Sequence, residues 1–124
     1  MTTLLYIAAS FAFGIGILHS VLGERYILKR LFRRDDLPKI FGSADFTIRT
    51  LRFAWHLTTI AWWGFAAIIL LLAERAISFA SLSTILAVTF LTTGAIALIA
   101  SRGRHFAWPV FLFIGAVCLY AAIN

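Results

Sequence analysis

Residues 55–73 read WHLTTIAWWGFAAIILLLA, a continuous run without a lysine, arginine, aspartate or glutamate. A helix needs about 20 predominantly apolar residues to cross the hydrocarbon layer of a bilayer, and this run meets that length. The chain has 124 residues, of which 62% are hydrophobic and 13% charged, and its mean hydropathy is +0.96. An average soluble domain carries about 25% charged residues. The composition and this run together predict an integral membrane protein.

On either side of this run, three further apolar stretches have a similar length and a helical pattern. Lipid admits only helices or closed barrels, because backbone polar groups find no water there. We therefore predict one all-α domain, residues 1–124, built as a bundle of four transmembrane helices. The expected spans are 3–22, 44–73, 77–100 and 105–123, and residues 23–43 are expected to form a cytoplasmic loop with a basic interfacial helix.

The basic residues predict the orientation. Of the eleven lysines and arginines, all but Arg75 lie in the segments 23–52 and 101–104. The positive-inside rule places these segments in the cytoplasm and both chain termini on the other side. A basic face attracts anionic lipid headgroups, which explains the net charge of +6 without a nucleic-acid partner. We predict a multi-pass protein of the bacterial inner (plasma) membrane.

Small residues recur at four-residue spacing in two of the expected spans. Such ladders let helix backbones approach closely in lipid. Internal packing is the simpler interpretation, and a homo-oligomer or a larger membrane complex is the alternative. The two ladders are Ala8, Ala12, Gly16 and Ser20, and Thr89, Thr93, Ala97 and Ser101.

The histidines are the most informative polar residues. His19, His56 and His105 fall in the same layer of the bilayer, near its cytoplasmic side, on three different expected spans. Polar groups within a span usually face the interior of the bundle or a wet cavity. We therefore expect a polar pocket that opens to the cytoplasm.

One helical face supplies a wall of this pocket, because its residues follow each other at spacings of three and four. These residues are Arg49, Arg52, His56, Thr59 and Trp63. Trp55 and Trp108 complete the expected lining, and Glu24 in the loop is the candidate ion-pair partner of the arginines.

The pocket has several interpretations. The histidines can tie helices together by hydrogen bonds. Three imidazoles can instead form a site for zinc, copper or iron, and two can be axial ligands of a haem. Arg49, Arg52 and His56 can clamp a phosphate, a carboxylate or a lipid headgroup.

No carboxylate pair, nucleophile elbow, Walker loop or HExxH sequence is present, which argues against an enzyme. Binding of a ligand in the pocket (a metal ion, haem or an anionic group) is the favoured function. A non-catalytic accessory subunit of a larger membrane complex is the first alternative, and a small anion or lipid transporter is the second.

Overall fold

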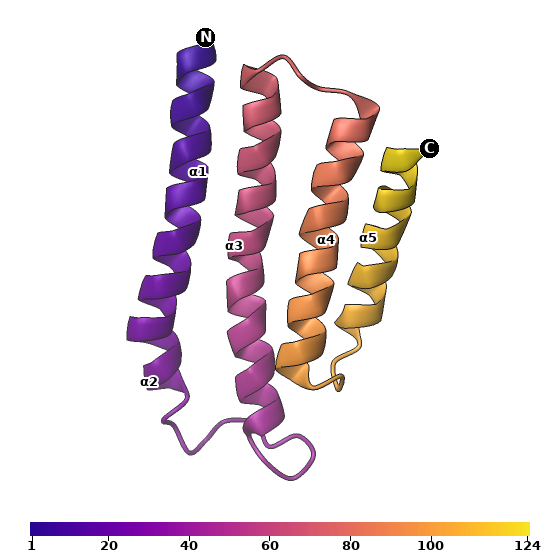
Figure 1. Ribbon diagram of the computed structural model, residues 1–124. Helices are drawn as coiled ribbons and strands as arrows, with labels where there is room; N and C mark the ends of the chain where they lie inside the picture. Colours follow the sequence, from indigo (N-terminus) through magenta and orange to yellow (C-terminus); the bar gives the residue numbers. More distant parts are fainter.

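The computed structural model describes all residues of the chain, and they form four main helices side by side (Figure 1). The first, α1, runs from Thr2 to Leu22 and continues through a π-helical turn, Gly23–Leu28, into the short α2, Lys29–Leu31. The other helices are α3 (Asp45–Ala73), α4 (Phe79–Ser101) and α5 (Ala107–Ile123). The predicted all-α architecture of four helices is confirmed.

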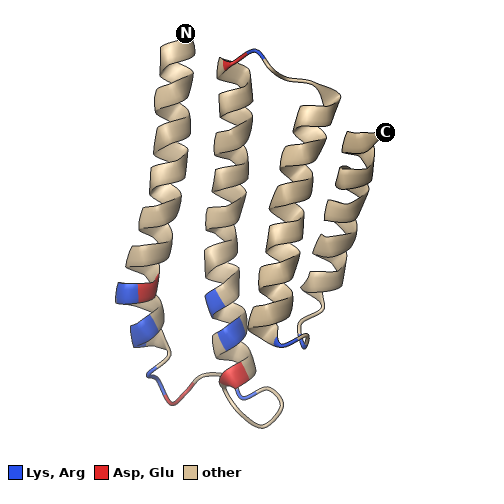
Figure 2. Cartoon of the chain, in the orientation of Figure 1, with Lys and Arg blue, Asp and Glu red and all other residues tan.

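Three of the helices are long and apolar enough to cross a membrane: Thr2–Leu31 with its π-helical turn, Asp45–Ala73 and Phe79–Ser101. The fourth, α5, has 17 residues. All lysines and arginines except Arg75 gather at one end of the helix array, where α1 ends and α3 begins (Figure 2). We call this end the basic end.

Local sequence signals set the helix boundaries. Ser78 and Ser81 form a reciprocal capping box at the start of α4, which satisfies backbone N–H groups that have no partner within the helix. Arg102 and Gly103 end α4 with left-handed backbone conformations, as is common at helix C-termini. Pro109 falls in the first turn of α5, where its missing N–H costs little.

The helices pack in the order of the chain. The backbone of α1 approaches α3, α3 approaches α4 and α4 approaches α5, and no other pair of main helices is in contact. The four helices therefore form an open row in which α1 and α5 each have one helical neighbour. Hydropathy does not distinguish a face that meets lipid from one that meets a helix, so the sequence did not indicate this openness.

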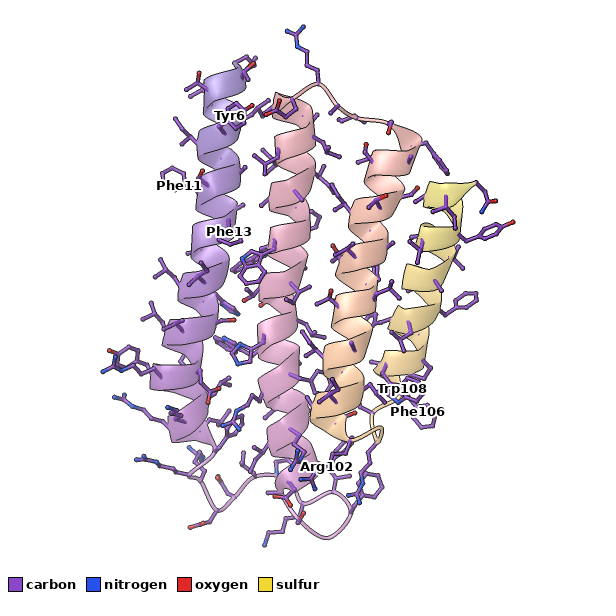
Figure 3. All side chains as sticks on the ribbon, in the orientation of Figure 1. Tyr6, Phe11, Phe13, Arg102, Phe106 and Trp108 are labelled. Carbon is purple, nitrogen blue, oxygen red and sulfur yellow. The ribbon has the colours of Figure 1, made fainter.

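Large apolar side chains point outward, and small ones fill the interfaces. Phe11 and Phe106 are 73% and 90% exposed, and Figure 3 shows them projecting away from the neighbouring helices. The buried residues are mostly small, among them Ala66, Ala87 and Ala97. A soluble monomer rarely exposes so much contiguous apolar surface, and these helices are those of a membrane protein.

The segment after the first span differs from the expected interfacial helix. Residues 23–31 continue the axis of α1 instead of forming a separate helix (Figure 1). Gly23 adopts a right-handed helical conformation, so it does not end the helix. No other helix-breaking residue follows before the DDLP sequence at 35–38. The π-helical turn buries Leu28, which is 2% exposed.

Candidate functional site

The interface between α1 and α3 is joined by side-chain hydrogen bonds along its length, and we call it the α1/α3 seam. Three side chains of α3 donate to backbone carbonyls of α1. Trp55 Nε1 donates to the oxygen of His19 at 3.1 Å, and Thr59 Oγ1 to that of Gly16 at 3.0 Å. Trp63 Nε1 donates to the oxygen of Phe13 at 3.1 Å. The donors lie one helical turn apart, so they follow one face of α3.

Ser20 connects this seam to His56. Its Oγ lies 2.7 Å from Thr59 Oγ1 and 2.8 Å from His56 Nδ1. A carbonyl only accepts, so the single hydroxyl proton of Thr59 goes to Gly16. Thr59 must then accept from Ser20, and Ser20 must accept from His56. The network thus assigns a proton to Nδ1 of His56, and the other ring nitrogen, Nε2, faces Glu24.

Glu24 is an acidic residue of the basic end and lies in the π-helical turn after α1. Its carboxylate is held by Arg52, with Nη2 3.2 Å from Oε1 and Nε 3.2 Å from Oε2. The second carboxylate oxygen also lies 3.6 Å from His56 Nε2. The guanidinium of Arg52 lies 4.9 Å above the ring of Phe32. Glu24 is therefore already engaged by one cation and contacts a second titratable group.

A cavity of about 590 Å³ opens beside this ion pair, and we call it the basic cavity. Its walls are Ser20, Val21, Glu24, Arg25, Lys29 and His56. A second cavity of about 260 Å³ lies on the other side of His56, between α3 and α4. It is lined by Arg49, Arg52, Phe53, His56, Ile96 and Ala100. Arg49 also reaches α4, with Nη1 3.5 Å from the carbonyl oxygen of Ala100.

Arg25, Lys29 and Ser20 were not among the site residues predicted from the sequence. A regular α-helix would turn Lys29 away from Glu24, because five residues do not complete a whole number of turns. The backbone N–H of Lys29 bonds to the carbonyl of Glu24, which is the spacing of a π-helical turn and brings residues five apart over one another. Hydrophobic periodicity carries no signal for this hydrogen-bond pattern. The small-residue ladder did include Ser20, but only as a packing residue.

His19 lies in a different environment from His56. Its ring stacks flat on the indole of Trp55, with centroids 4.5 Å apart and planes 3° apart, and meets the edge of Trp62 at 5.0 Å. A Cβ atom at Gly23 would overlap the indole of Trp55, so only glycine permits this contact. Nε2 of His19 is buried without a hydrogen-bond partner.

His105 is separate from both. Its Nδ1 accepts a hydrogen bond from the backbone N–H of Ala107 at 3.1 Å, which caps the start of α5. Its ring meets Phe53 edge-on at 5.2 Å. Trp108 donates from Nε1 to the carbonyl of Gly103 at 3.1 Å, within its own loop, and lines neither cavity of the basic end.

The structure thus separates residues that the sequence placed at one depth. No three His, Cys, Asp or Glu side chains come together as a metal-binding group. The residues that do meet are His56, Thr59, Arg52 and Glu24, joined by Ser20. Depth in the membrane follows from position along the chain, but the direction of a side chain around its helix axis follows from packing. Gly16 and Gly23 set that packing, because the side chains of α3 lie directly against them.

No known protein family, curated protein or solved structure matches the chain.

Proposed function

We propose that the chain is a multi-pass membrane protein that binds a phosphate-bearing anion in its basic cavity, with the basic end in the cytoplasm. The orientation rests on the gathering of basic residues at one end. The 17 residues of α5 would extend about 25 Å, which is at the short end of the range for a membrane span. All four helices would then cross the bilayer.

One observation carries the binding proposal. The basic cavity contains one carboxylate, that of Glu24, and this carboxylate is already paired with Arg52. Arg25 and Lys29 line the same cavity, are exposed, and have no carboxylate partner. The cavity therefore holds an excess of positive charge that a ligand anion can neutralise. Guanidinium and ammonium groups bind phosphate oxygens through charge-assisted hydrogen bonds.

The position of the cavity favours phosphate over other anions. It lies where α1 and α3 leave the apolar segment, at the level at which a bilayer presents its phosphate groups. The same chemistry fits the phosphate of a lipid headgroup and a free phosphate ester. Metal or haem binding has less support, because His56 and Glu24 are the only imidazole and carboxylate lining the cavity, whereas a protein zinc site usually takes at least three ligands.

The test is the affinity of the purified protein for phosphatidylglycerol, measured by titration with native mass spectrometry in a neutral detergent. The double variant Arg25→Ala/Lys29→Ala should weaken binding roughly thirtyfold, since each cation near a membrane surface contributes about 1 kcal/mol. The matched control is Arg30→Ala/Arg33→Ala, which removes the same charge from exposed residues outside the cavity.

The control pair should retain most of the affinity. Equal losses in the two double variants would mean that the protein attracts anions through its overall charge, and the binding proposal would fail. Titration with glycerophosphoglycerol, the same headgroup without acyl chains, distinguishes a site for the phosphate group alone from one that needs a lipid.

A further inference from the structure

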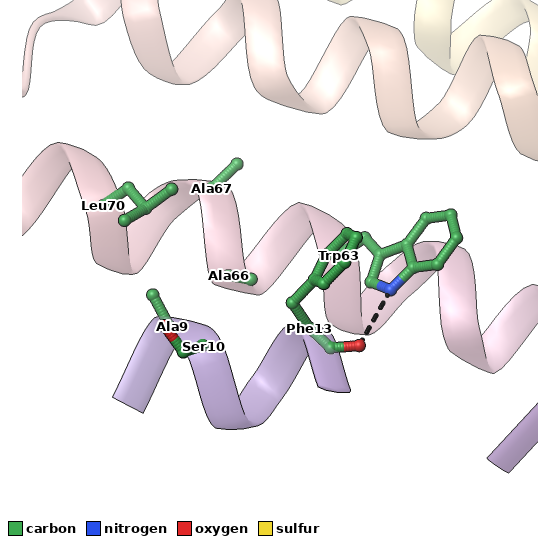
Figure 4. Close-up of a pocket in the computed structure, with 7 residues that line it drawn as sticks. All are labelled: Ala9, Ser10, Phe13, Trp63, Ala66, Ala67 and Leu70. Carbon is green, nitrogen blue, oxygen red and sulfur yellow. Dashed lines mark hydrogen bonds between the residues drawn. The ribbon is translucent and has the colours of Figure 1, made fainter. Parts of the chain in front are cut away.

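Two apolar grooves lie along α3, farther from the basic end than the two cavities described above. The first, of about 460 Å³, lies between α1 and α3 (Figure 4). It is lined by Ala9, Ser10, Phe13, Trp63, Ala66, Ala67 and Leu70. The second, of about 310 Å³, lies between α3 and α4. Trp63 and Ala67 border both grooves, so the two grooves flank a single ridge of α3.

The two cavities at the basic end also lie on either side of a shared residue of α3. His56 borders the basic cavity between α1 and α3 and also the cavity between α3 and α4. His56 and Trp63 are seven residues apart, so they lie on the same face of α3 and about 10 Å apart along its axis. On each side of α3, a charged cavity therefore lies one or two turns from an apolar groove.

The positions on α1 agree with this alignment. Phe13 lines the apolar groove and Ser20 lines the basic cavity, and a spacing of seven residues places them on one face of α1. The groove and the cavity thus follow the same side of the α1/α3 seam.

The grooves present few free hydrogen-bond donors to a polar ligand. The hydroxyl groups of Ser10, Thr84 and Thr89 donate to carbonyls of their own helices, at 2.9, 2.8 and 2.8 Å. The indole N–H of Trp63 is used by the carbonyl of Phe13 (Figure 4). The hydroxyl of Thr92 in the second groove is the exception and has no hydrogen-bond partner. The other donors are paired within the protein, so an apolar chain breaks none of their bonds by entering.

We propose that the charged cavities and the apolar grooves form one site for an anionic phospholipid. The phosphate lies at Arg25 and Lys29, and the two acyl chains lie on either side of Trp63. This inference rests on the proposed anion binding and names the ligand class. Three observations indicate a phospholipid as the ligand. The basic end has the charge to bind its phosphate, the cavities and grooves are continuous along the same faces of α1 and α3, and the two grooves match its two acyl chains.

The experiment compares two probes that share a headgroup, dioleoyl phosphatidylglycerol and glycerophosphoglycerol. Ala67→Leu places extra volume in both grooves at once, because Ala67 lines both. The matched control is Ala61→Leu, in an apolar groove of about 190 Å³ on a different face of α3. Ala67→Leu should weaken binding of the lipid roughly tenfold, since displacing a few methylene groups costs more than 1.4 kcal/mol. It should leave binding of glycerophosphoglycerol unchanged, and Ala61→Leu should change neither.

The outcomes separate this inference from the proposed function. If Ala67→Leu and Ala61→Leu have equal effects on the lipid while Arg25→Ala/Lys29→Ala still weakens both probes, the anion site stands and the phospholipid site is overturned. If the charge variant changes neither probe, the anion site itself is wrong. Equal binding of dioleoyl phosphatidylcholine would overturn the requirement for an anionic headgroup.

Should Ala67→Leu fail to fold, Val88→Phe fills the groove between α3 and α4 from a position that is 60% exposed and therefore tolerates a larger side chain. It should weaken binding of the lipid and spare that of glycerophosphoglycerol. An unchanged affinity for the lipid would count against the inference in the same way.

Discussion

Two helix interfaces of this protein are built by opposite means. In the α1/α3 seam, tryptophan and threonine side chains donate to carbonyls of the facing helix. The seam has the Glu24–Arg52 ion pair at the basic end and a hydrogen bond from Tyr6 to Glu74 at the other end. Between α4 and α5, no side-chain hydrogen bond crosses, and Gly94 and Gly115 let the backbones approach.

This difference explains where the candidate site lies. A contact made by glycine against backbone leaves no space and no polar group for a ligand. The polar side chains of the α1/α3 seam are longer, so they hold the helices together and also leave cavities beside them. The α4/α5 interface therefore provides close packing, and the α1/α3 seam provides polar side chains with cavities beside them.

The largest effect on stability is expected between α4 and α5. A Cβ atom at Gly115 would lie 2.8 Å from the backbone nitrogen of Leu91, and no side-chain rotation relieves that contact. Gly115→Ala should destabilise the protein by roughly 2–3 kcal/mol, as overpacking of a tight interior does. The midpoint of unfolding in mixed detergent and SDS measures it. Gly14→Ala is the control, because nothing lies within 4 Å of its added carbon. Equal midpoints for the two variants would refute the close packing of α4 and α5.

An intermediate effect is expected in the α1/α3 seam. Thr59→Val keeps the shape of the side chain but removes the hydroxyl between Gly16 and Ser20. We expect a loss of roughly 1 kcal/mol, within the range for interhelical hydrogen bonds in membranes. Thr84→Val, whose hydroxyl bonds only within α4, should cost less in the same unfolding assay. A larger loss at Thr84 would show that the seam is not held by its polar bonds.

The smallest effect is expected in the loop outside both interfaces. Arg34 pairs with Asp36 and holds the pKa of that carboxyl below its ordinary value, mainly through their hydrogen bond. A lowered folded-state pKa stabilises the folded state above the unfolded pKa, and this contribution is lost as the pH falls through the folded pKa. Because both side chains are exposed, Asp36→Asn should leave the unfolding midpoint at neutral pH unchanged. A clear drop at neutral pH would mean that the loop supports the helices.

The helices were predictable from the sequence because each apolar run is bounded by charge or by helix-breaking residues. The expected span 44–73 corresponds to Asp45–Ala73, and 105–123 corresponds to Ala107–Ile123. The face of α3 that carries Arg52, His56, Thr59 and Trp63 was also predictable, since helical spacing determines it.

The rest of the candidate site depended on contacts between helices. The π-helical turn that brings Lys29 and Glu24 to the same cavity is a hydrogen-bond pattern, and no residue type specifies it. The separation of His19 from His56 follows from the indole of Trp55, which occupies the space beside Gly23 and stacks on His19. The sequence gives the depth of each histidine, whereas its neighbours depend on how α1 and α3 are rotated against each other.

The binding of a phosphate group in the basic cavity can be measured directly, because the chain contains two lysines, Lys29 in the cavity and Lys39 in the loop. Protein labelled with ¹⁵N-lysine would be reconstituted in a phosphorus-free galactolipid with a stoichiometric amount of phosphatidylglycerol. Solid-state NMR would then record which lysine nitrogen is dephased by ³¹P, with Lys39→Arg used to assign the two signals. We expect dephasing at Lys29, at the distance of a charge-assisted hydrogen bond, and none at Lys39. Equal dephasing of the two signals, or dephasing of Lys39 alone, would contradict a phosphate site in the basic cavity.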